Sequence, residues 1–221
     1  YDEPADGRYL LHIGGGYDFS ALTQDPVLGQ KLYRSTAIPE FFVGDPAAPP
    51  LASALRTPVF VDTGPVPAND FHLFGLELAG VYGSFYFQAE YMQTMVNQIG
   101  GPVLTFDGAY AQAGWFLTGE HRPYNRAAGV FDRLRPYEDF FSFDGLCCGS
   151  GAWELAVRWS YIDLNSQNVT GGNLNDLTLG LNWYLNPFSR LQFNYIRAMA
   201  DGLGPAAGNT DIYALRWQVD F

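Results

Sequence analysis

The chain has 221 residues and a formal net charge of −11, from 12 Lys and Arg against 23 Asp and Glu. This balance excludes a protein that binds nucleic-acid backbones, because such proteins need clustered basic side chains to displace counterions. Hydrophobic residues make up 48% of the chain, yet the mean hydropathy is only −0.07, so apolar and polar residues are interleaved throughout. No run of residues approaches the roughly 18 apolar positions of a membrane-spanning helix.

The first part of the chain predicts strands separated by a long loop. Residues 8–19 alternate weakly and contain three consecutive glycines, residues 20–56 are rich in Pro, and residues 57–64 are a short alternating run. Alternation of apolar and polar residues is typical of strands, whereas Pro-rich stretches are typical of loops. Nothing in the composition marks a second domain, so we expect one domain over residues 1–221.

The middle of the chain predicts a tight hairpin. Residues 72–96 contain two alternating runs on either side of Tyr82, Gly83 and Ser84, which predict the turn. Residues 105–118 alternate in the same way and predict the next strand.

A second long loop is expected near residues 119–150, before the C-terminal part of the chain. Four more alternating runs of about ten residues follow it, at residues 153–164, 173–185, 190–198 and 211–221. In the last run one face is wholly apolar and aromatic, and the opposite face includes Arg216 and Asp220.

Both a soluble β-sandwich and a membrane barrel would give such alternation. Aromatic residues are 16% of the chain, and Tyr and Trp recur near strand ends, where amphipathic rings are stable at a membrane interface. The final residue, Phe221, is an aromatic of the kind that the outer-membrane assembly machinery reads. We therefore predict an all-β fold, an antiparallel transmembrane β-barrel in the bacterial outer membrane; a soluble sandwich would instead stay in solution without detergent.

The strand count suggests a part of a larger barrel. We count about nine strands, whereas single-chain bacterial barrels have an even number with both ends in the periplasm. The chain is thus expected to be the C-terminal portion of a longer porin-type barrel. The same parity places residues 165–172 and 200–209 outside the cell, and residues 186–189 and 119–150 in the periplasm.

Several strings resemble a known family. Residues 151–164, 171–198 and 213–221 resemble the C-terminal strands of the phosphate-selective porins O and P, notably in GAWEL and LGLNWYLNP, and the likeness extends back to about residue 57. The resemblance implies a sixteen-stranded trimeric barrel in the outer membrane, with a ladder of arginines in the lumen that draws in phosphate. It also implies a constricting loop, which we expect outside this chain.

Alternation assigns a set of charged side chains to the lumen. They are Arg8, Glu77, Glu90, Glu154, Arg158, Asp176, Arg216 and Asp220. Acids outnumber arginines in this set, which weighs against phosphate selectivity. Arg158 and Arg216 either coordinate anions or pair with carboxylates across neighbouring strands, with Glu154 and Asp220 as partners; we favour pairing.

Two other arginines, Arg190 and Arg197, are assigned to the lipid face, where their side chains would extend to the membrane interface. The adjacent Cys147 and Cys148 are either a strained vicinal disulfide, links to other chains, or two loop thiols.

No enzyme or cofactor site is expected. The three histidines, His12, His72 and His121, are scattered, so no Ser-His-Asp set can be nominated, and no metal site is predicted.

The sequence therefore predicts a passive diffusion channel for small hydrophilic solutes or ions, with phosphate and other anions among the candidates. Its expected partners are outer-membrane lipid and small ions, but not nucleic acid; the family resemblance implies further copies in a homotrimer. The alternative is a structural barrel that anchors an envelope complex through its long loops and cysteines, with other envelope proteins as partners.

Overall fold

The computed structural model describes residues 2, 7–43, 57–141, 149–202 and 207–220, and these residues form strands, turns and loops. Within these ranges no helix is both long and apolar enough to cross a membrane. Phe221, Cys147 and Cys148 lie outside the described residues, so their predicted roles stay predictions.

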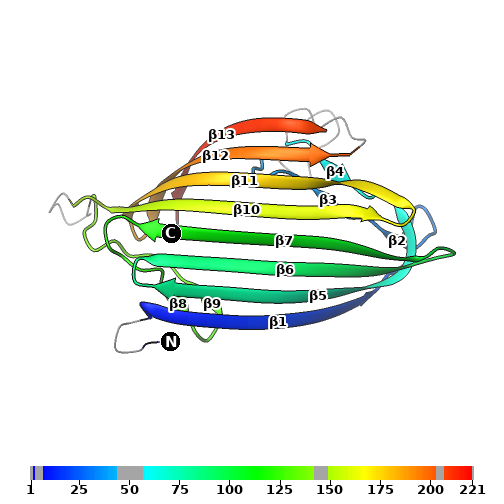
Figure 1. The fold of residues 1–221 in the computed structure, drawn as a ribbon, viewed down its shortest axis with the longest axis horizontal. Coiled ribbons are helices and arrows are strands. Elements are labelled where there is room, and N and C mark those ends of the chain that lie inside the picture. The colour runs from blue at the N-terminus through cyan, green and yellow to red at the C-terminus, as the bar shows by residue number, and fades with distance from the viewer. Residues whose placement is uncertain (1, 3–6, 44–56, 142–148, 203–206, 221) are drawn as a thin grey trace.

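Eight long strands form one continuous antiparallel sheet, which curves strongly (Figure 1). In sheet order they are β1 (Tyr9–Ala21), β5 (Val66–Tyr82), β6 (Phe85–Gln98), β7 (Val103–Phe116), β10 (Ala152–Ser166), β11 (Val169–Asn186), β12 (Ser189–Asp201) and β13 (Gly208–Val219). Strands β1 and β13 stand at opposite ends of this order. The all-β antiparallel prediction is confirmed, and the sheet is open in the described part of the chain.

The predicted hairpin is present where alternation placed it. Tyr82 pairs with Phe85 across the β5–β6 turn, and Gly83 adopts a positive φ of 61°, a conformation that costs glycine little. Register follows from this turn, so that Glu77 of β5 lies opposite Glu90 of β6. Because side chains alternate across a sheet, this register brings the two carboxylates to the same face.

The count of nine strands is wrong at residues 57–64. Only Val61–Asp62 (β4) is a strand there, and it pairs with the two-residue strand β3 (Thr36–Ala37) instead of joining the large sheet. The apolar residues of this run, Phe60 and Val61, are buried against the inside of the sheet, which explains their strand-like pattern. A further two-residue strand, β2 (Leu32–Tyr33), pairs with the start of β5.

Eight long strands are an even number, so the strand count does not indicate an incomplete barrel. Strand β1 begins and strand β13 ends at the same end of the sheet (Figure 1). The relative sides of the turns are as predicted: the β10–β11 turn lies at one end, and the β11–β12 turn and the β7–β10 connection lie at the other.

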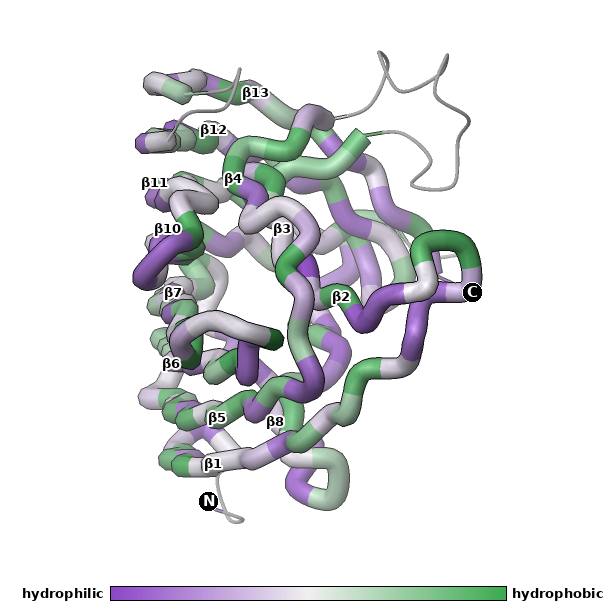
Figure 2. The backbone as a smooth tube through the Cα atoms, turned by 90° about the vertical axis from the view of Figure 1, so that its right-hand side faces the viewer, coloured by the Kyte–Doolittle hydropathy of each residue, from purple (hydrophilic) through white to green (hydrophobic). Residues whose placement is uncertain are grey.

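The two predicted loops cover the concave face of the sheet. We call residues 22–43 with 57–65 the first inner segment; it carries β2, β3 and β4. Residues 117–141 are the second inner segment, with β8 (Tyr124–Asn125) and β9 (Val130–Phe131). Figure 2 looks along the strands and shows β2, β3, β4 and β8 on the concave side. We expected the constricting loop to lie outside this chain, yet two segments of the chain itself cover the inner face.

Each inner segment packs on the sheet through its own apolar cluster. The first cluster holds Phe60, Val61, Val66, Ala68, Val96, Leu104, Phe106, Leu164, Val169, Leu174, Ala198 and Ala200. The second holds Val81, Tyr86, Phe116, Leu134, Ala152 and Tyr184. The buried core therefore lies on the concave side, between the sheet and the inner segments.

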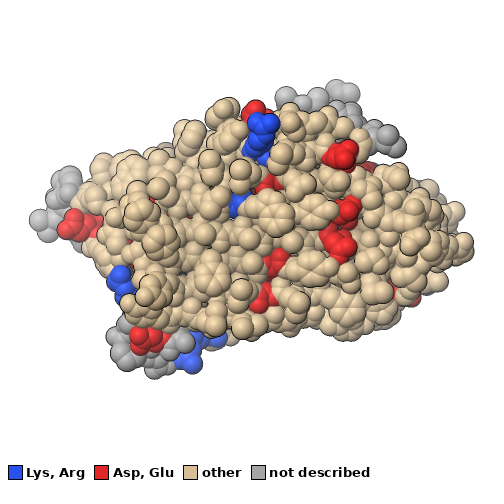
Figure 3. Space-filling model, in the orientation of Figure 1, with Lys and Arg blue, Asp and Glu red and all other residues tan. Residues whose placement is uncertain are grey.

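The convex face is apolar and exposed. Its large exposed side chains include Leu11, Ile13, Leu76, Phe87, Leu155, Val157, Leu179, Phe193, Leu215 and Trp217. Figure 3 shows this face as mostly uncharged, with acidic side chains near its middle and toward the end where β10 and β12 finish. A continuous apolar surface of this size is rare on soluble monomers. The other sheets in the described residues are the two-stranded pairs of the inner segments, so no second layer of a sandwich covers it.

Aromatic rings form two bands across the convex face. Near one end Trp153 stacks on Trp183, with ring centroids 4.9 Å apart. Toward the other end three tyrosines each donate to an aspartate. These bonds are Tyr91 to Asp107 at 2.5 Å, Tyr161 to Asp163 at 3.2 Å and Tyr195 to Asp211 at 2.8 Å. Bands of amphipathic rings on either side of an apolar surface are typical of transmembrane barrels.

Candidate functional site: a charged recess on the concave face

A recess of about 280 Å³ opens on the concave face between the two inner segments. Its charged lining residues come from four elements: Glu40 from the first inner segment, Arg122 from the second, Glu154 and Arg158 from β10, and Arg190 from β12. Three arginines therefore meet two carboxylates in one space, the reverse of the acidic balance that the sequence predicts for the lumen. The local charge at this recess is set by the inner segments as much as by the strands.

Arg158 contacts three residues in and around the recess, Glu40, Gln112 and Tyr110. Its Nε donates to Oε1 of Glu40 at 2.9 Å, and its Nη1 donates to Oε1 of Gln112 at 2.9 Å. The guanidinium carbon lies 3.8 Å from the centre of the Tyr110 ring, a cation–π contact. The predicted pairing of Arg158 with a carboxylate is present, but the partner is Glu40, not Glu154.

Glu154 belongs to the wall beneath the second inner segment. It is only 1% exposed and accepts hydrogen bonds from the hydroxyls of Tyr86 and Tyr184 and from the amide of Asn182. Arg122 lies close enough for its charge to interact with that of Glu154. Because these groups satisfy the carboxylate, Glu154 is a structural contact and not a free charge of the recess.

Arg122 is held by contacts on several sides. Its Nη1 donates to the Tyr184 hydroxyl at 3.3 Å, and its guanidinium carbon lies 5.5 Å from the Tyr86 ring centre and 5.7 Å from that of Phe131. Its Nε is buried without a partner in the described residues. The second inner segment thus brings a buried cation to the Glu154 cluster.

Asp176 lies beneath the tip of the first inner segment. It is 2% exposed, and its Oδ2 accepts a hydrogen bond of 2.9 Å from the main-chain N–H of Glu40. Its Oδ1 has no partner among the described residues. Through Asp176 and Arg158, the tip of the first inner segment is bound to both β10 and β11.

Glu77 and Glu90 lie on the concave face beside each other but outside the set of charged residues that line the recess. Glu90 accepts from the Tyr110 hydroxyl at 2.5 Å. Glu77 lies 3.0 Å from Nε2 of His12, whose Nδ1 contacts the Tyr124 hydroxyl at 2.6 Å. Glu77 and His12 therefore connect the sheet to the second inner segment.

Arg8, Arg216 and Asp220 are not among the residues that line this recess, although Asp220 lines a neighbouring pocket together with Arg122 and Arg190. Arg8 donates from Nη1 to the Tyr137 hydroxyl at 2.7 Å and holds the second inner segment. Arg216 is exposed and opposite Gln192. Asp220 accepts from Gln218 at 2.9 Å, so the described contacts of Asp220 do not include the predicted pairing with Arg216.

Of the two arginines assigned to the lipid face, Arg190 lies on the concave face instead. It lines the recess and donates from Nη2 to Gln218 at 2.8 Å, so its assignment to the lipid face is wrong. Arg190 lies two and four residues before Gln192 and Asn194, so it shares their face of the strand. This spacing was already visible in the sequence. Arg197 does lie on the convex face, 3.7 Å from Asp211.

Sequence reasoning also missed Glu40 and Arg122, which lie in loops without periodicity and so gave no signal. Among the described residues, no group of three His, Cys, Asp or Glu side chains is placed to hold a metal ion.

The sequence pattern that defines the phosphate-selective porin O and P family matches residues 54–221. The chain belongs to this family. The resemblance predicted from residue 57 onward is thereby confirmed, and Glu40 lies before the matched range. The match covers all of the long strands except β1.

Two curated relatives extend the comparison. An uncharacterized protein of Caulobacter vibrioides is 33% identical over 144 residues, which cover 65% of this chain and 27% of that protein. Porin O of Pseudomonas aeruginosa is 29% identical over 154 residues, which cover 65% of this chain and 33% of Porin O. The chain spans about a third or less of the length of these relatives.

Proposed function

We propose that the chain forms part of an outer-membrane porin that passes small hydrophilic anions, phosphate among them, by passive diffusion. The observation that carries this proposal is the recess in which Arg122, Arg158 and Arg190 converge between the two inner segments. Family membership supports the same proposal, since the family is that of the phosphate-selective porins O and P.

The convex face supports a position in lipid. Its apolar side chains are exposed and lie between two aromatic bands, which would sit at the two interfaces of a bilayer. The edges of β1 and β13 carry backbone groups that lipid cannot satisfy, so a membrane-embedded sheet needs further strands to close it. We propose that such strands complete a barrel, with sixteen strands and three subunits as the family resemblance implies.

The recess supports anion passage through its local charge. A passing anion loses part of its hydration shell, and guanidinium groups replace those interactions at short range. The charges of Glu154 and the buried Arg122 offset each other, so we expect Arg158 and Arg190 to be the arginines that attract a passing anion. The net charge of the whole chain is a poor guide because charges beyond about 10 Å are screened by salt.

Single-channel recording tests this proposal. Protein purified from native outer membranes in detergent would be added to a planar bilayer under a potassium chloride gradient, followed by titration with inorganic phosphate. We expect stepwise conductance, an anion-biased reversal potential and block by phosphate, and we expect Arg190→Gln to weaken both the bias and the block. Stepwise conductance with a cation bias would contradict anion selection, and well-folded protein without conductance would contradict the channel.

A second candidate is a structural barrel that anchors an envelope complex. The observation in its favour is that both inner segments cover the concave face and are bound there by buried groups. Such a barrel would conduct little and would co-purify with other envelope proteins, whereas a porin would conduct without them.

A further inference from the structure

We propose that Glu40 is a tethered competitor of the transported anion at Arg158. Its carboxylate pairs with the Arg158 guanidinium in the absence of an anion and is displaced when an anion binds. Glu40 therefore lowers the affinity of the recess for anions. This inference rests on the proposed anion passage and adds a residue that sets its affinity.

The contact itself is one that an anion would use. A carboxylate and a phosphate both bind a guanidinium by accepting hydrogen bonds from its N–H groups. Glu40 Oε1 takes the Nε donor of Arg158 at 2.9 Å, and Gln112 takes Nη1. An anion that approaches Arg158 therefore meets a donor already in use, and binding at that donor requires displacement of Glu40.

The side chain of Glu40 can leave without moving its segment. The main-chain N–H of Glu40 is bound to the buried Asp176 at 2.9 Å, and this bond does not involve the Glu40 carboxylate. The two side chains of the ion pair are each 30% exposed, so water and ions reach them. Rotation of the Glu40 side chain is thus enough to free Arg158.

Other carboxylates near the recess do not have this freedom. Glu154 is buried and bound by two tyrosines and Asn182, and Glu90 accepts from Tyr110 and Gln88. Glu40 differs from both because its described side-chain partner is an arginine of the recess. A tethered group competes like a ligand at millimolar effective concentration, so a free anion must reach a comparable level to replace it.

The test is a titration of phosphate block in single channels of the wild type and of Glu40→Gln. Removing the charge leaves the main-chain bond to Asp176 in place. We expect the phosphate concentration for half-block to fall about two- to fivefold, the range expected for loss of a partly exposed ion pair, and the reversal potential to shift toward that of chloride.

Two further variants make the test specific. Asp62→Asn removes a carboxylate of the same segment that is paired with Arg34, not with Arg158, and we expect it to leave the half-block concentration unchanged. In an Arg158→Gln background, Glu40→Gln should lose its effect.

An unchanged half-block concentration in Glu40→Gln, in channels that remain anion-selective and phosphate-blocked, would overturn the competitor role and leave the proposed function standing. An equal effect of Glu40→Gln on the half-block concentration in the Arg158→Gln background would also overturn it. Glu40 would then act only through its negative charge and not through its contact with Arg158. Wild-type channels without anion bias would overturn the proposed function and this inference together.

Discussion

The two inner segments enter the curved sheet from opposite ends and are bound to it by different forces. The first packs mainly through aliphatic and aromatic side chains, with Phe60 and Val61 buried in a large apolar cluster. The second combines a smaller apolar cluster with a buried charge, Arg122, set among tyrosines and Glu154. This comparison distinguishes two kinds of charged residue. Buried charges such as Arg122 and Glu154 hold a segment in place, whereas the ion pair of Glu40 and Arg158 is partly exposed and can separate.

Breaking the polar attachment of the second segment should have the largest effect. Glu154→Ala leaves the charge of Arg122 buried without its counter-charge, so we expect the free energy of unfolding to fall by about 3–5 kcal/mol. Urea titration of the protein in lipid or detergent would measure this. Glu154→Gln is the matched control: it removes the same charge but keeps the side-chain volume and one acceptor oxygen, so the difference between the two variants measures the lost hydrogen bonds and packing, and the loss that they share measures the charge. A loss below about 1 kcal/mol for Glu154→Ala would show that the attachment is as weak as a surface pair.

Trimming the apolar attachment of the first segment should have a smaller effect. Val61 is 2% exposed, and Val61→Ala removes two methyl groups from its cluster, for an expected loss of about 1.5–2 kcal/mol. Limited proteolysis should show faster cleavage of the first segment and unchanged cleavage of the second. Equal acceleration in both would mean that the segments are not held independently.

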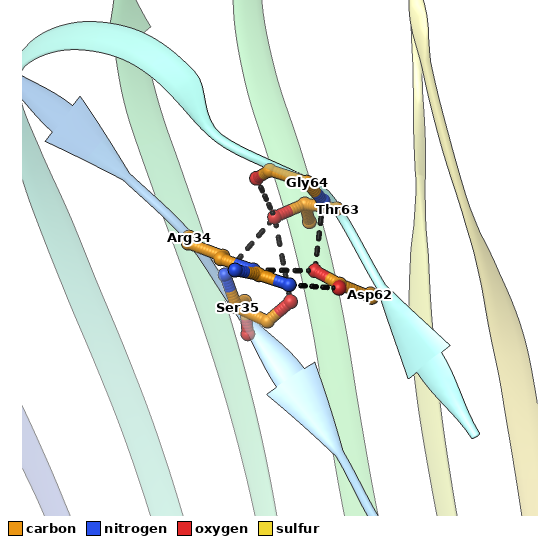
Figure 4. A network of polar contacts seen from close by, with 5 residues as sticks. All are labelled: Arg34, Ser35, Asp62, Thr63 and Gly64. Atoms are coloured by element: carbon orange, nitrogen blue, oxygen red, sulfur yellow. Dashed lines mark hydrogen bonds and ion pairs between the residues drawn. The ribbon is translucent and has the colours of Figure 1, made fainter. Parts of the chain in front are cut away.

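The smallest effect is expected at the base of the first segment, where Arg34 pairs with Asp62 and Thr63 bonds to Ser35 (Figure 4). The hydrogen bond from Arg34 lowers the pKa of the Asp62 carboxyl below its usual value. The pair therefore stabilises the fold above the unfolded pKa of Asp, about 3.9, and this stability is lost as pH falls through the lowered pKa.

Since Arg34 is largely exposed, we expect Asp62→Asn to cost no more than about 1 kcal/mol at neutral pH. Unfolding curves of the wild type and the variant should converge in acid. A difference that persists below the folded pKa, where the Asp62 carboxyl is as uncharged as the Asn amide, would show that the effect does not come from the ion pair.

The sheet could be predicted from the sequence because each long strand presents one face to the exterior and one to the interior. Apolar and polar residues therefore alternate along the strand with a period of two. The β5–β6 turn at Gly83 and the facing of Glu77, Glu154 and Arg158 all followed from this period. Arg190 could have been assigned correctly by the same rule.

The inner segments could not be predicted in the same way. Glu40 and Arg122 act through contacts with strands that are distant in the sequence. Their segments have an irregular backbone without alternating residues, so no sequence pattern indicates these contacts. The run at residues 57–64 shows the opposite error: Phe60 and Val61 are apolar because they pack against the inside of the sheet, not because they face the exterior.

The first apolar cluster also has a consequence for the order of assembly. Phe60 and Val61 pack with Leu104 of β7 and Leu174 of β11, and the cluster extends to Ala200 at the end of β12. The first inner segment precedes all of these strands in the chain, so most of its partners are synthesised after it. Loop-closure entropy makes such distant contacts slow to form. The recess around Arg158 is therefore expected to acquire its final shape late in folding, once β12 has joined the sheet.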